Sequence, residues 1–99
     1  MIVLVNLKKE AAPEAYERWL GERYVPAVLK LPSVDEWRGH RVMGLAGADG
    51  EPPFHYIVAV EINDLEQLGK DTESEQVQAL LGELGGYAEV TQLMTERFL

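Results

Sequence analysis

The stretch Tyr56-Ile57-Val58-Ala59-Val60 has no polar residue at any position, and neither does Ile2-Val3-Leu4-Val5 near the start of the chain. Short runs that are apolar on both alternating faces and rich in β-branched residues are typical of strands covered on two sides. Residues 34–45 and 90–99 carry charges on both alternating faces, which is typical of edge strands. We therefore predict a four-stranded sheet with residues 2–7 and 54–62 at its centre and the other two strands at its edges.

One helix is predicted between the first two strands. Pro13 suits a first helical position. Pro26 cannot donate a backbone hydrogen bond, so this helix is expected to kink or end near Arg23 and to continue as a short second piece to Leu31. The apolar face of this segment follows spacings of three and four residues and comprises Tyr16, Trp19, Leu20, Tyr24, Ala27, Val28 and Leu31.

A second helix is predicted between the last two strands. Thr72-Glu73-Ser74-Glu75 fits a capping box at its start, and Gly85-Gly86 is expected to end it. A short turn over residues 65–68, closed by Gly69, precedes it. The apolar face of this helix is Val77, Leu80, Leu81 and Leu84.

The order strand-helix-strand-strand-helix-strand indicates an α+β fold of the ferredoxin-like βαββαβ type with an antiparallel four-stranded sheet. At 99 residues the chain is expected to form a single domain, residues 1–99. Two helices cover only one face of such a sheet, which leaves an apolar patch on the other face. We therefore predict a homodimer, sheet face against sheet face, through the patch Ile2, Leu4, Ile57 and Ala59.

Charge and composition exclude several classes of partner. The net charge is −8, and all of it lies in residues 51–99, which carry two Lys or Arg against ten Asp or Glu. Nucleic acid and anionic membrane surfaces are therefore not expected as partners. The chain has no cysteine, and the apolar run after Met1 is too short for a signal peptide or a membrane span. A cytoplasmic location is expected.

Family-level information comes from the segments Met1–Lys8, Ala15–Trp19, Leu31–Val34 leading into Trp37-Arg38, and Glu61–Asp64. They resemble the REDY-like HapK family of the dimeric α/β-barrel superfamily, and the resemblance covers nearly the whole chain. It implies a ferredoxin-like protomer that pairs into a barrel and an association with prodiginine-type pigment pathways. It also implies chemistry without a cofactor, such as dehydration of a carbamic acid.

A first candidate site lies between helix and sheet. If Leu45 pairs with Phe54, so that paired residue numbers sum to 99, one face of the hairpin collects Trp37, Met43, Leu45, Tyr56 and Arg41 under the helices. Aromatic side chains with a few polar groups are how small planar ligands are usually held, although aromatic residues at helical spacing are also ordinary core. Arg41 is the exception, because a lone guanidinium on an apolar face needs an anion or an acceptor. The predicted ligand-binding residues are Tyr16, Trp19, Tyr24, Trp37, Arg41 and Tyr56.

A second candidate site is a polar set on the opposite face of the hairpin, directed towards the interior of the barrel. Histidine moves protons near neutral pH, and a carboxylate can hold it in the useful tautomer. His40 with Glu61 fits this pattern, and the assumed pairing sets Arg38 opposite Glu61. The alternative is that both histidines are surface residues and that Arg38 and Glu61 form only an ion pair. The predicted residues are Asn6, Arg38, His40, His55 and Glu61, with His40, His55 and Glu61 as catalytic candidates.

The family resemblance, together with the polar groups on apolar strands, favours a small enzyme of secondary metabolism that transfers protons, such as in a dehydration, on an aromatic or pyrrole-like molecule. No cofactor is expected, and two histidines without cysteine form no recognisable set of metal ligands. Two alternatives remain open. One is a cofactor-free monooxygenase of the same superfamily, and the other is a non-catalytic protein that binds and shields a small aromatic molecule.

Overall fold

The two wholly apolar segments form the central strands of the sheet, as predicted. The structure, a computed structural model, describes all residues from Met1 to Leu99, and its four antiparallel strands lie in the order β2-β3-β1-β4. The strands are β1 (Ile2–Leu7), β2 (Val34–Arg41), β3 (Tyr56–Ile62) and β4 (Ala88–Leu93). The helices are α1 (Pro13–Trp19), η1 (Leu20–Tyr24), α2 (Val25–Val28), α3 (Leu65–Asp71) and α4 (Glu75–Tyr87). The predicted α+β, ferredoxin-like fold is confirmed.

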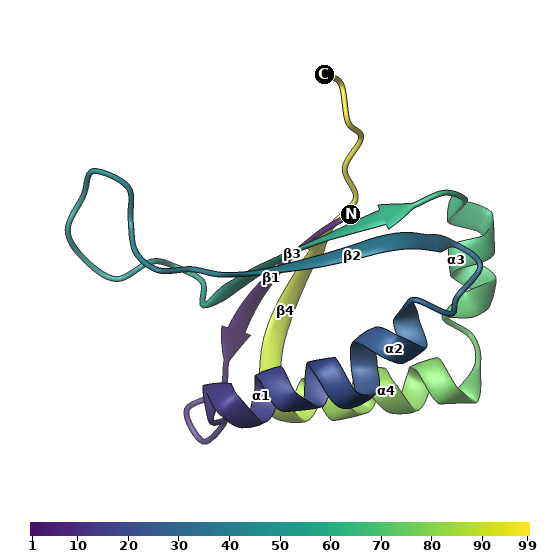
Figure 1. Cartoon of the computed structure of the whole chain (residues 1–99), viewed down its shortest axis with the longest axis horizontal. Coiled ribbons are helices and arrows are strands. Elements are labelled where there is room, and N and C mark those ends of the chain that lie inside the picture. The colour runs from purple at the N-terminus through teal and green to yellow at the C-terminus, as the bar shows by residue number, and fades with distance from the viewer.

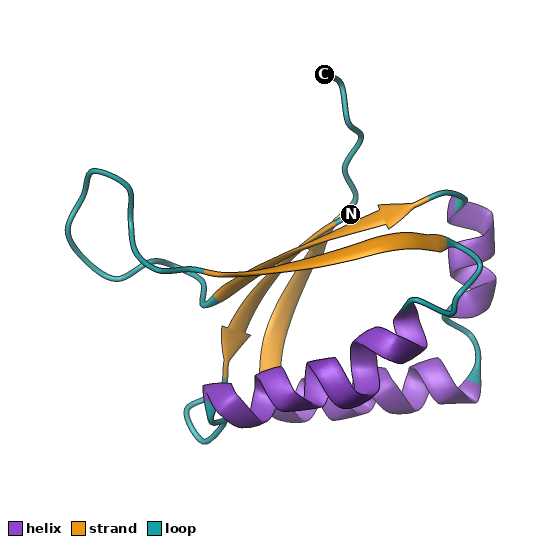
Figure 2. Cartoon of the chain, in the orientation of Figure 1, coloured by secondary structure: helices purple, strands orange, loops and turns teal.

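The helices cover one face of the sheet only (Figure 1). In Figure 2, α1 with α2 and α4 run side by side below the strands, and α3 stands at one end between the two layers. The core joins alternate residues of the central strands, such as Val5 and Val58, to Tyr16 of α1 and to Leu80 of α4. The intervening strand residues Ile2, Leu4, Ile57 and Ala59 are only partly covered, so the other face of the sheet is open.

Pro26 does not end the first helical segment, and the turn before it is wider than an α-helical turn. Residues Leu20–Tyr24 form a π-helical turn, η1, in which the amide of Val25 donates to the carbonyl of Leu20. Proline has no amide hydrogen for the α-helical bond to the carbonyl of Glu22, and its ring clashes with the preceding turn. The wider turn relieves this conflict, and the chain remains helical through α2.

The β2–β3 hairpin has a different register from the assumed one. Trp37 pairs with Val60 and Arg41 with Tyr56, so paired residue numbers sum to 97 rather than 99. Because side chains alternate with a period of two, a shift by two leaves every residue on its predicted face. The paired strands end at Arg41 and Tyr56, so residues 42–55 form a long loop. Met43 and Leu45 are exposed in it, and the prediction that they pack under the helices was wrong.

The second half of the chain departs from prediction at its helix and strand ends. Gly85-Gly86 does not end α4, which continues to Tyr87, because the buried Leu84 and the packing of Tyr87 hold the last turn on the core. Ser74 is the N-cap of α4, and its hydroxyl accepts a hydrogen bond from the backbone amide of Val77 at 3.2 Å. The last strand ends at Leu93, and residues 94–99 leave the sheet on the side opposite the helices (Figure 1).

The helix α3 extends beyond the predicted turn and is held at both ends. The Asp64 side chain accepts the amide of Gln67 at its start. At its other end, Asp71 accepts both the amide and the hydroxyl of Ser33, at 3.1 and 2.6 Å, and Ser33 is fully buried. These bonds fix α3 to the start of β2. No helix in the structure is long and apolar enough to cross a membrane.

Candidate functional site: a cavity between sheet and helices

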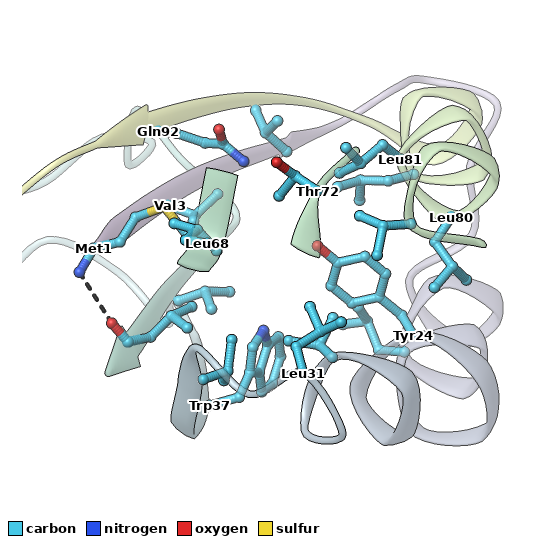
Figure 3. Close-up of a pocket in the computed structure, with 18 of the residues that line it drawn as sticks. Met1, Val3, Tyr24, Leu31, Trp37, Leu68, Thr72, Leu80, Leu81 and Gln92 are labelled. Carbon is cyan, nitrogen blue, oxygen red and sulfur yellow. Dashed lines mark hydrogen bonds between the residues drawn. The ribbon is translucent and has the colours of Figure 1, made fainter. Parts of the chain in front are cut away.

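A cavity of about 320 Å³ lies between the sheet and the helices (Figure 3). Of its 22 lining residues 19 are hydrophobic, and none is Asp, Glu, Lys, Arg or His. Its inner wall is formed by buried residues, including Val5, Val58 and Leu84. The exposed residues of the lining are Gln78 of α4 with Val90 and Gln92 of β4. The cavity therefore opens between α4 and the edge strand β4.

Three of the predicted ligand-binding residues line this cavity: Tyr16, Tyr24 and Trp37. Figure 3 shows the hydroxyl of Tyr24 and the indole nitrogen of Trp37 on the cavity side of their rings, one from the helical layer and the other from the sheet. Burial raises the pKa of both Tyr16 and Tyr24 above the ordinary tyrosine value. Both hydroxyls therefore keep their protons at neutral pH and can donate hydrogen bonds.

Trp19 and Tyr56 lie behind the cavity wall rather than in it. Trp19 packs on Tyr24 with ring centroids 5.1 Å apart and donates its indole N–H to Glu83 at 2.9 Å. Tyr56 packs on Tyr16 at 5.0 Å and donates its hydroxyl to Glu17 at 2.8 Å. Both side chains are buried, and their polar atoms are already paired, so they support the lining side chains from outside.

Arg41 is not the lone cation on an apolar face that the sequence indicated. Its guanidinium binds both carboxylate oxygens of Glu17, Nε to Oε2 at 2.8 Å and Nη2 to Oε1 at 2.5 Å, and its side chain is 73% exposed. The hydrogen bonds from Arg41 and then Tyr56 lower the pKa of Glu17 to about 2. Burial, followed by the bond to Glu17, raises the pKa of Tyr56 to about 12. The cluster lies outside the cavity, so the anion that Arg41 binds is a side chain of the same protein.

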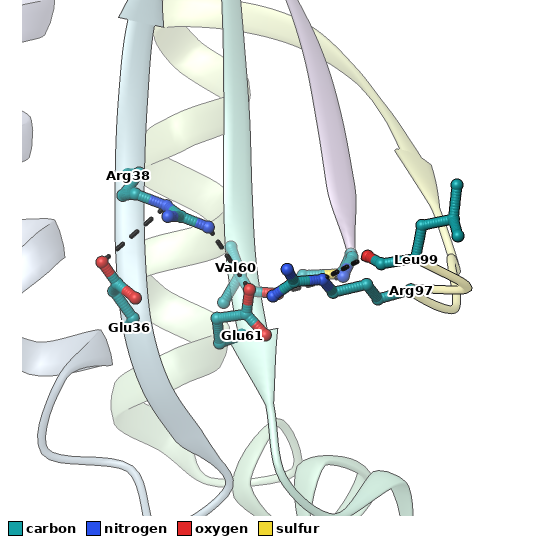
Figure 4. Close-up of polar contacts among 7 residues, drawn as sticks. Glu36, Arg38, Val60, Glu61, Arg97 and Leu99 are labelled. Carbon is teal, nitrogen blue, oxygen red and sulfur yellow. Dashed lines mark hydrogen bonds and ion pairs between the residues drawn. The ribbon is translucent and has the colours of Figure 1, made fainter.

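The predicted polar set is distributed over the open face and the edge of the sheet. Arg38 is paired with Ala59 rather than directly opposite Glu61, because of the register shift. It still reaches Glu61 diagonally at 3.3 Å and Glu36 at 3.8 Å (Figure 4). All three side chains are more than half exposed, and exposed ion pairs contribute at most about 1 kcal/mol.

His40 and Glu61 are not brought together. His40 pairs with Ile57, four residues from Glu61 and about 13 Å along the strand at about 3.3 Å per residue. His55 is exposed, and its Nδ1 accepts the backbone amide of Leu7 at 2.8 Å, so the neutral ring carries its proton on Nε2. Asn6 pairs with Glu89 of β4. No three His, Asp or Glu side chains are grouped so that they could hold a metal ion.

Two glutamates that the sequence did not single out, Glu17 and Glu83, accept the hydrogen bonds of the aromatic and arginine side chains around the cavity. Three polar residues of the lining, Gln78, Gln92 and Thr72, were not predicted either. No local pattern marks the two glutamates, because each acts on residues distant in sequence. The three polar lining residues lie on or beside predicted elements, but only the packing of α4 on β4 brings them to the cavity.

A family model described as REDY-like protein HapK matches residues 1–98 of this sequence. The chain belongs to the REDY-like HapK family. No curated protein matches it in sequence. Family membership thus rests on a match across nearly the whole chain, and the resemblance seen in the sequence is confirmed.

Solved structures support the fold. The crystal structure of HapK from Hahella chejuensis is similar with a TM-score of 0.73 and 21% identity, over 99% of this chain and 95% of that one. An ethyl tert-butyl ether degradation (EthD) family protein from Bacillus halodurans is similar with a TM-score of 0.61 and 19% identity, over 95% of this chain and 99% of that one. A dimeric ferredoxin-like protein of unknown function from Thermobifida fusca is similar with a TM-score of 0.64 and 13% identity, over 93% of this chain and 87% of that one. At these identities the likeness is one of fold.

Proposed function

We propose that this HapK-family protein binds an uncharged, largely apolar molecule with aromatic or pyrrole-like rings in the cavity between its sheet and helices. The observation that carries the proposal is a 320 Å³ space lined by hydrophobic residues with no charged side chain. Removing a ring from water into such a site is favourable by about 25 cal/mol per Å² of apolar surface. An ionised group would lose its hydration there, and no charged side chain of the lining would replace it; the amino terminus of Met1 is a cation, but it already donates to the carbonyl of Val60 at 3.0 Å.

The chemistry that we propose for the bound molecule is a cofactor-independent proton transfer such as a dehydration. Support comes from membership of the HapK family and from the two protonated tyrosine hydroxyls in the lining, which can donate hydrogen bonds to a carbonyl or a leaving hydroxyl. His40, His55 and Glu61, the catalytic candidates from the sequence, do not line the cavity, so any catalytic role of theirs belongs to a different site. Because His40 pairs with Ile57, four residues from Glu61, the two side chains would act as separate groups in the interior of a dimer that covers the open face.

Binding is tested with two dyes that share one ring skeleton. N-phenyl-1-naphthylamine is uncharged, and 8-anilino-1-naphthalenesulfonate adds a sulfonate to nearly the same rings. The fluorescence of the neutral dye should rise on saturable binding with one site per chain, and the sulfonate should bind at least tenfold more weakly. Equal or stronger binding of the sulfonate would contradict a cavity without charged side chains as the binding site.

A matched pair of variants ties this binding to the cavity. Leu81 lines the cavity beside its opening and is partly buried, whereas Leu65 is 64% exposed on α3 and outside the lining. Leu81→Trp should fill the entrance and abolish dye binding, while Leu65→Trp should leave it unchanged. If the two variants bind the neutral dye equally well, the dye occupies another surface and the proposal is wrong.

The three candidate functions differ in the fate of the bound molecule. A proton-transfer enzyme converts a hydroxylated ring substrate without oxygen, a monooxygenase consumes oxygen with a phenolic substrate, and a binding protein releases its ligand unchanged. Incubation of the protein with a quinol under an oxygen electrode separates the second function from the others. Anaerobic loss of water from a hydroxylated substrate, detected by mass spectrometry, separates the first from the third.

A further inference from the structure

Three side-chain hydrogen-bond donors of the cavity have no partner in the protein. Trp19 and Tyr56 donate to glutamates, but the hydroxyls of Tyr16 and Tyr24 and the indole N–H of Trp37 make no hydrogen bond within the chain. Nevertheless, no buried polar side-chain atom is left without a partner, so each of these three groups reaches open space. For Tyr16, which is only 1% exposed, that space is the cavity.

The π-helical turn aligns the two tyrosine donors, Tyr16 and Tyr24. Residues Tyr16, Leu20, Tyr24 and Val28 are spaced by four, and all of them line the cavity. In a regular α-helix a step of four residues advances by about 400°, so three steps would rotate Val28 by about 120° away from Tyr16. The extra residue accommodated by the turn at Leu20–Tyr24 offsets about 100° of this drift, the angle of one residue. The widened turn thus keeps Tyr24 directed into the cavity.

The indole of Trp37 is positioned from the sheet side by Gly39. A Cβ atom at Gly39 would lie 2.8 Å from both Cη2 and Cζ3 of the Trp37 ring, a distance that real Cβ atoms do not tolerate. The absence of a side chain at Gly39 therefore lets the ring lie along β2 with its nitrogen towards the cavity (Figure 3). Trp37 and Tyr24 hence present donors from opposite layers of the fold.

The remaining polar side chains of the lining make no hydrogen bond to these three donors. The Thr72 hydroxyl donates to the carbonyl of Gly69, and the Thr72 carbonyl accepts from Gln78 at 2.6 Å. No carboxylate lines the cavity, and the two amide oxygens of the lining, on Gln78 and Gln92, belong to exposed residues at its opening. A molecule that fills the cavity meets unpaired N–H and O–H groups, and covering them without a hydrogen bond is costly.

We propose that the ligand is an uncharged ring compound that carries a hydrogen-bond acceptor, such as a ketone or aldehyde oxygen, and that Tyr24 and Trp37 are the specificity-determining residues that bind this acceptor. This inference rests on the proposed function, since it concerns the same cavity. It adds a polar requirement to what would otherwise be recognition by size and hydrophobicity alone. Ring compounds without an acceptor leave both donors unpaired and bind more weakly.

The test uses two uncharged probes of nearly equal shape. 1-Acetylnaphthalene has a carbonyl where 1-ethylnaphthalene has a methylene group, and each is titrated as a competitor of N-phenyl-1-naphthylamine. The wild-type protein should prefer the acetyl compound by roughly fivefold, the effect of one net hydrogen bond. Equal affinities for the two probes would overturn the inference and leave the proposed function standing. If neither the probes nor the dye binds, the proposed function itself fails.

Two variants test whether Tyr24 and Trp37 cause the preference for the acetyl compound. Tyr24→Phe and Trp37→Phe keep an aromatic ring and remove one donor, and each should lower the preference towards unity. Tyr24→Phe also keeps the size of the ring, so its affinity for 1-ethylnaphthalene should change little. Tyr87→Phe is the matched control, because Tyr87 packs on Trp19 with centroids 5.2 Å apart and does not line the cavity. A preference that persists at its wild-type value in both Tyr24→Phe and Trp37→Phe would overturn the assignment.

Discussion

Trp19 donates its indole N–H to Glu83 across a separation of 64 residues, with Nε1 and Oε1 2.9 Å apart. The same carboxylate accepts two bonds of 2.6 Å from Arg23, which lies in η1. One side chain of α4 thereby joins both α1 and η1, the helices that carry Tyr16 and Tyr24 into the cavity. The bonds from Arg23 and then Trp19 lower the pKa of Glu83 to about 2.

Glu83→Gln should weaken the protein at neutral pH more than in acid. The pKa of Glu83 falls from 4.5 to about 2 on folding, so the stability that its charge contributes is fully present above pH 4.5 and is lost as the pH falls towards 2. Urea unfolding at about pH 7, 4.5 and 2.5 measures this, and the gap between wild type and variant should close with acid. Glu73→Gln, at an exposed residue without an ion pair, should show no such trend.

Removing the hydroxyl of Tyr16 should cost far less stability than removing that of Tyr56. Both side chains are buried, but only Tyr56 makes a hydrogen bond, to Glu17 at 2.8 Å. Tyr56→Phe is expected to lower the free energy of unfolding by about 1 kcal/mol or more, whereas Tyr16→Phe should be neutral within about 0.5 kcal/mol because no bond is lost. Denaturant unfolding of the two variants provides the measurement, and an equal loss in both would show that the Tyr16 hydroxyl has a partner.

Gly39→Ala should displace the ring of Trp37 and reduce binding in the cavity. The added methyl group would lie 2.8 Å from the ring, and Trp37 lines the cavity, so the ring must move or the strand must shift. We expect a several-fold loss of affinity for N-phenyl-1-naphthylamine and a changed tryptophan emission spectrum. Gly44→Ala is the control, since a Cβ at Gly44 meets nothing within 4 Å. Unchanged affinity in Gly39→Ala would mean that Trp37 does not shape the binding space.

The fold could be predicted from the sequence because its signal is local. Val58 and Ile57 lie on opposite faces of one strand, and a run that is apolar at both positions identifies a central strand whatever its partner. For the same reason the β2–β3 register could be wrong by two residues without moving Trp37 to the wrong face. The strand ends could not be predicted, since Met43 and Leu45 continue the alternation of β2 although the loop carries them into solvent.

The site was only partly predictable, because its geometry depends on partners far apart in sequence. Aromatic side chains at helical spacing identified Tyr16 and Tyr24, and the strand pattern identified Trp37. The same pattern grouped Trp19 and Tyr56 with them, because nothing local distinguishes an aromatic residue that lines a cavity from one that packs behind its wall. Arg41 was expected to need an anion, and it has one in Glu17, a residue whose position opposite β2 follows only from the packing of α1.

A second copy of the chain is expected to cover the open face of the sheet. Leu4 pairs with Ile57 and Ile2 with Ala59 at the centre of this face, where the helices leave all four side chains partly exposed. Burying such a patch against a second copy removes apolar surface from water in both chains, and the exposed charges of Arg38 and Glu61 lie beside it. We expect the protein to be a homodimer of 198 residues, twice the 99 of one chain.

Ile57→Glu should convert this dimer to a monomer, because two copies of the new carboxylate would be buried in one interface. Light scattering coupled to size-exclusion chromatography measures the mass, and Leu65→Glu, at an exposed residue of α3, is the control that should stay dimeric. The monomer should still bind N-phenyl-1-naphthylamine, because the cavity lies on the helical side of the sheet and is lined by one chain. A wild-type protein that elutes as a monomer at micromolar concentration would refute the dimer, and with it the site proposed for His40 and Glu61.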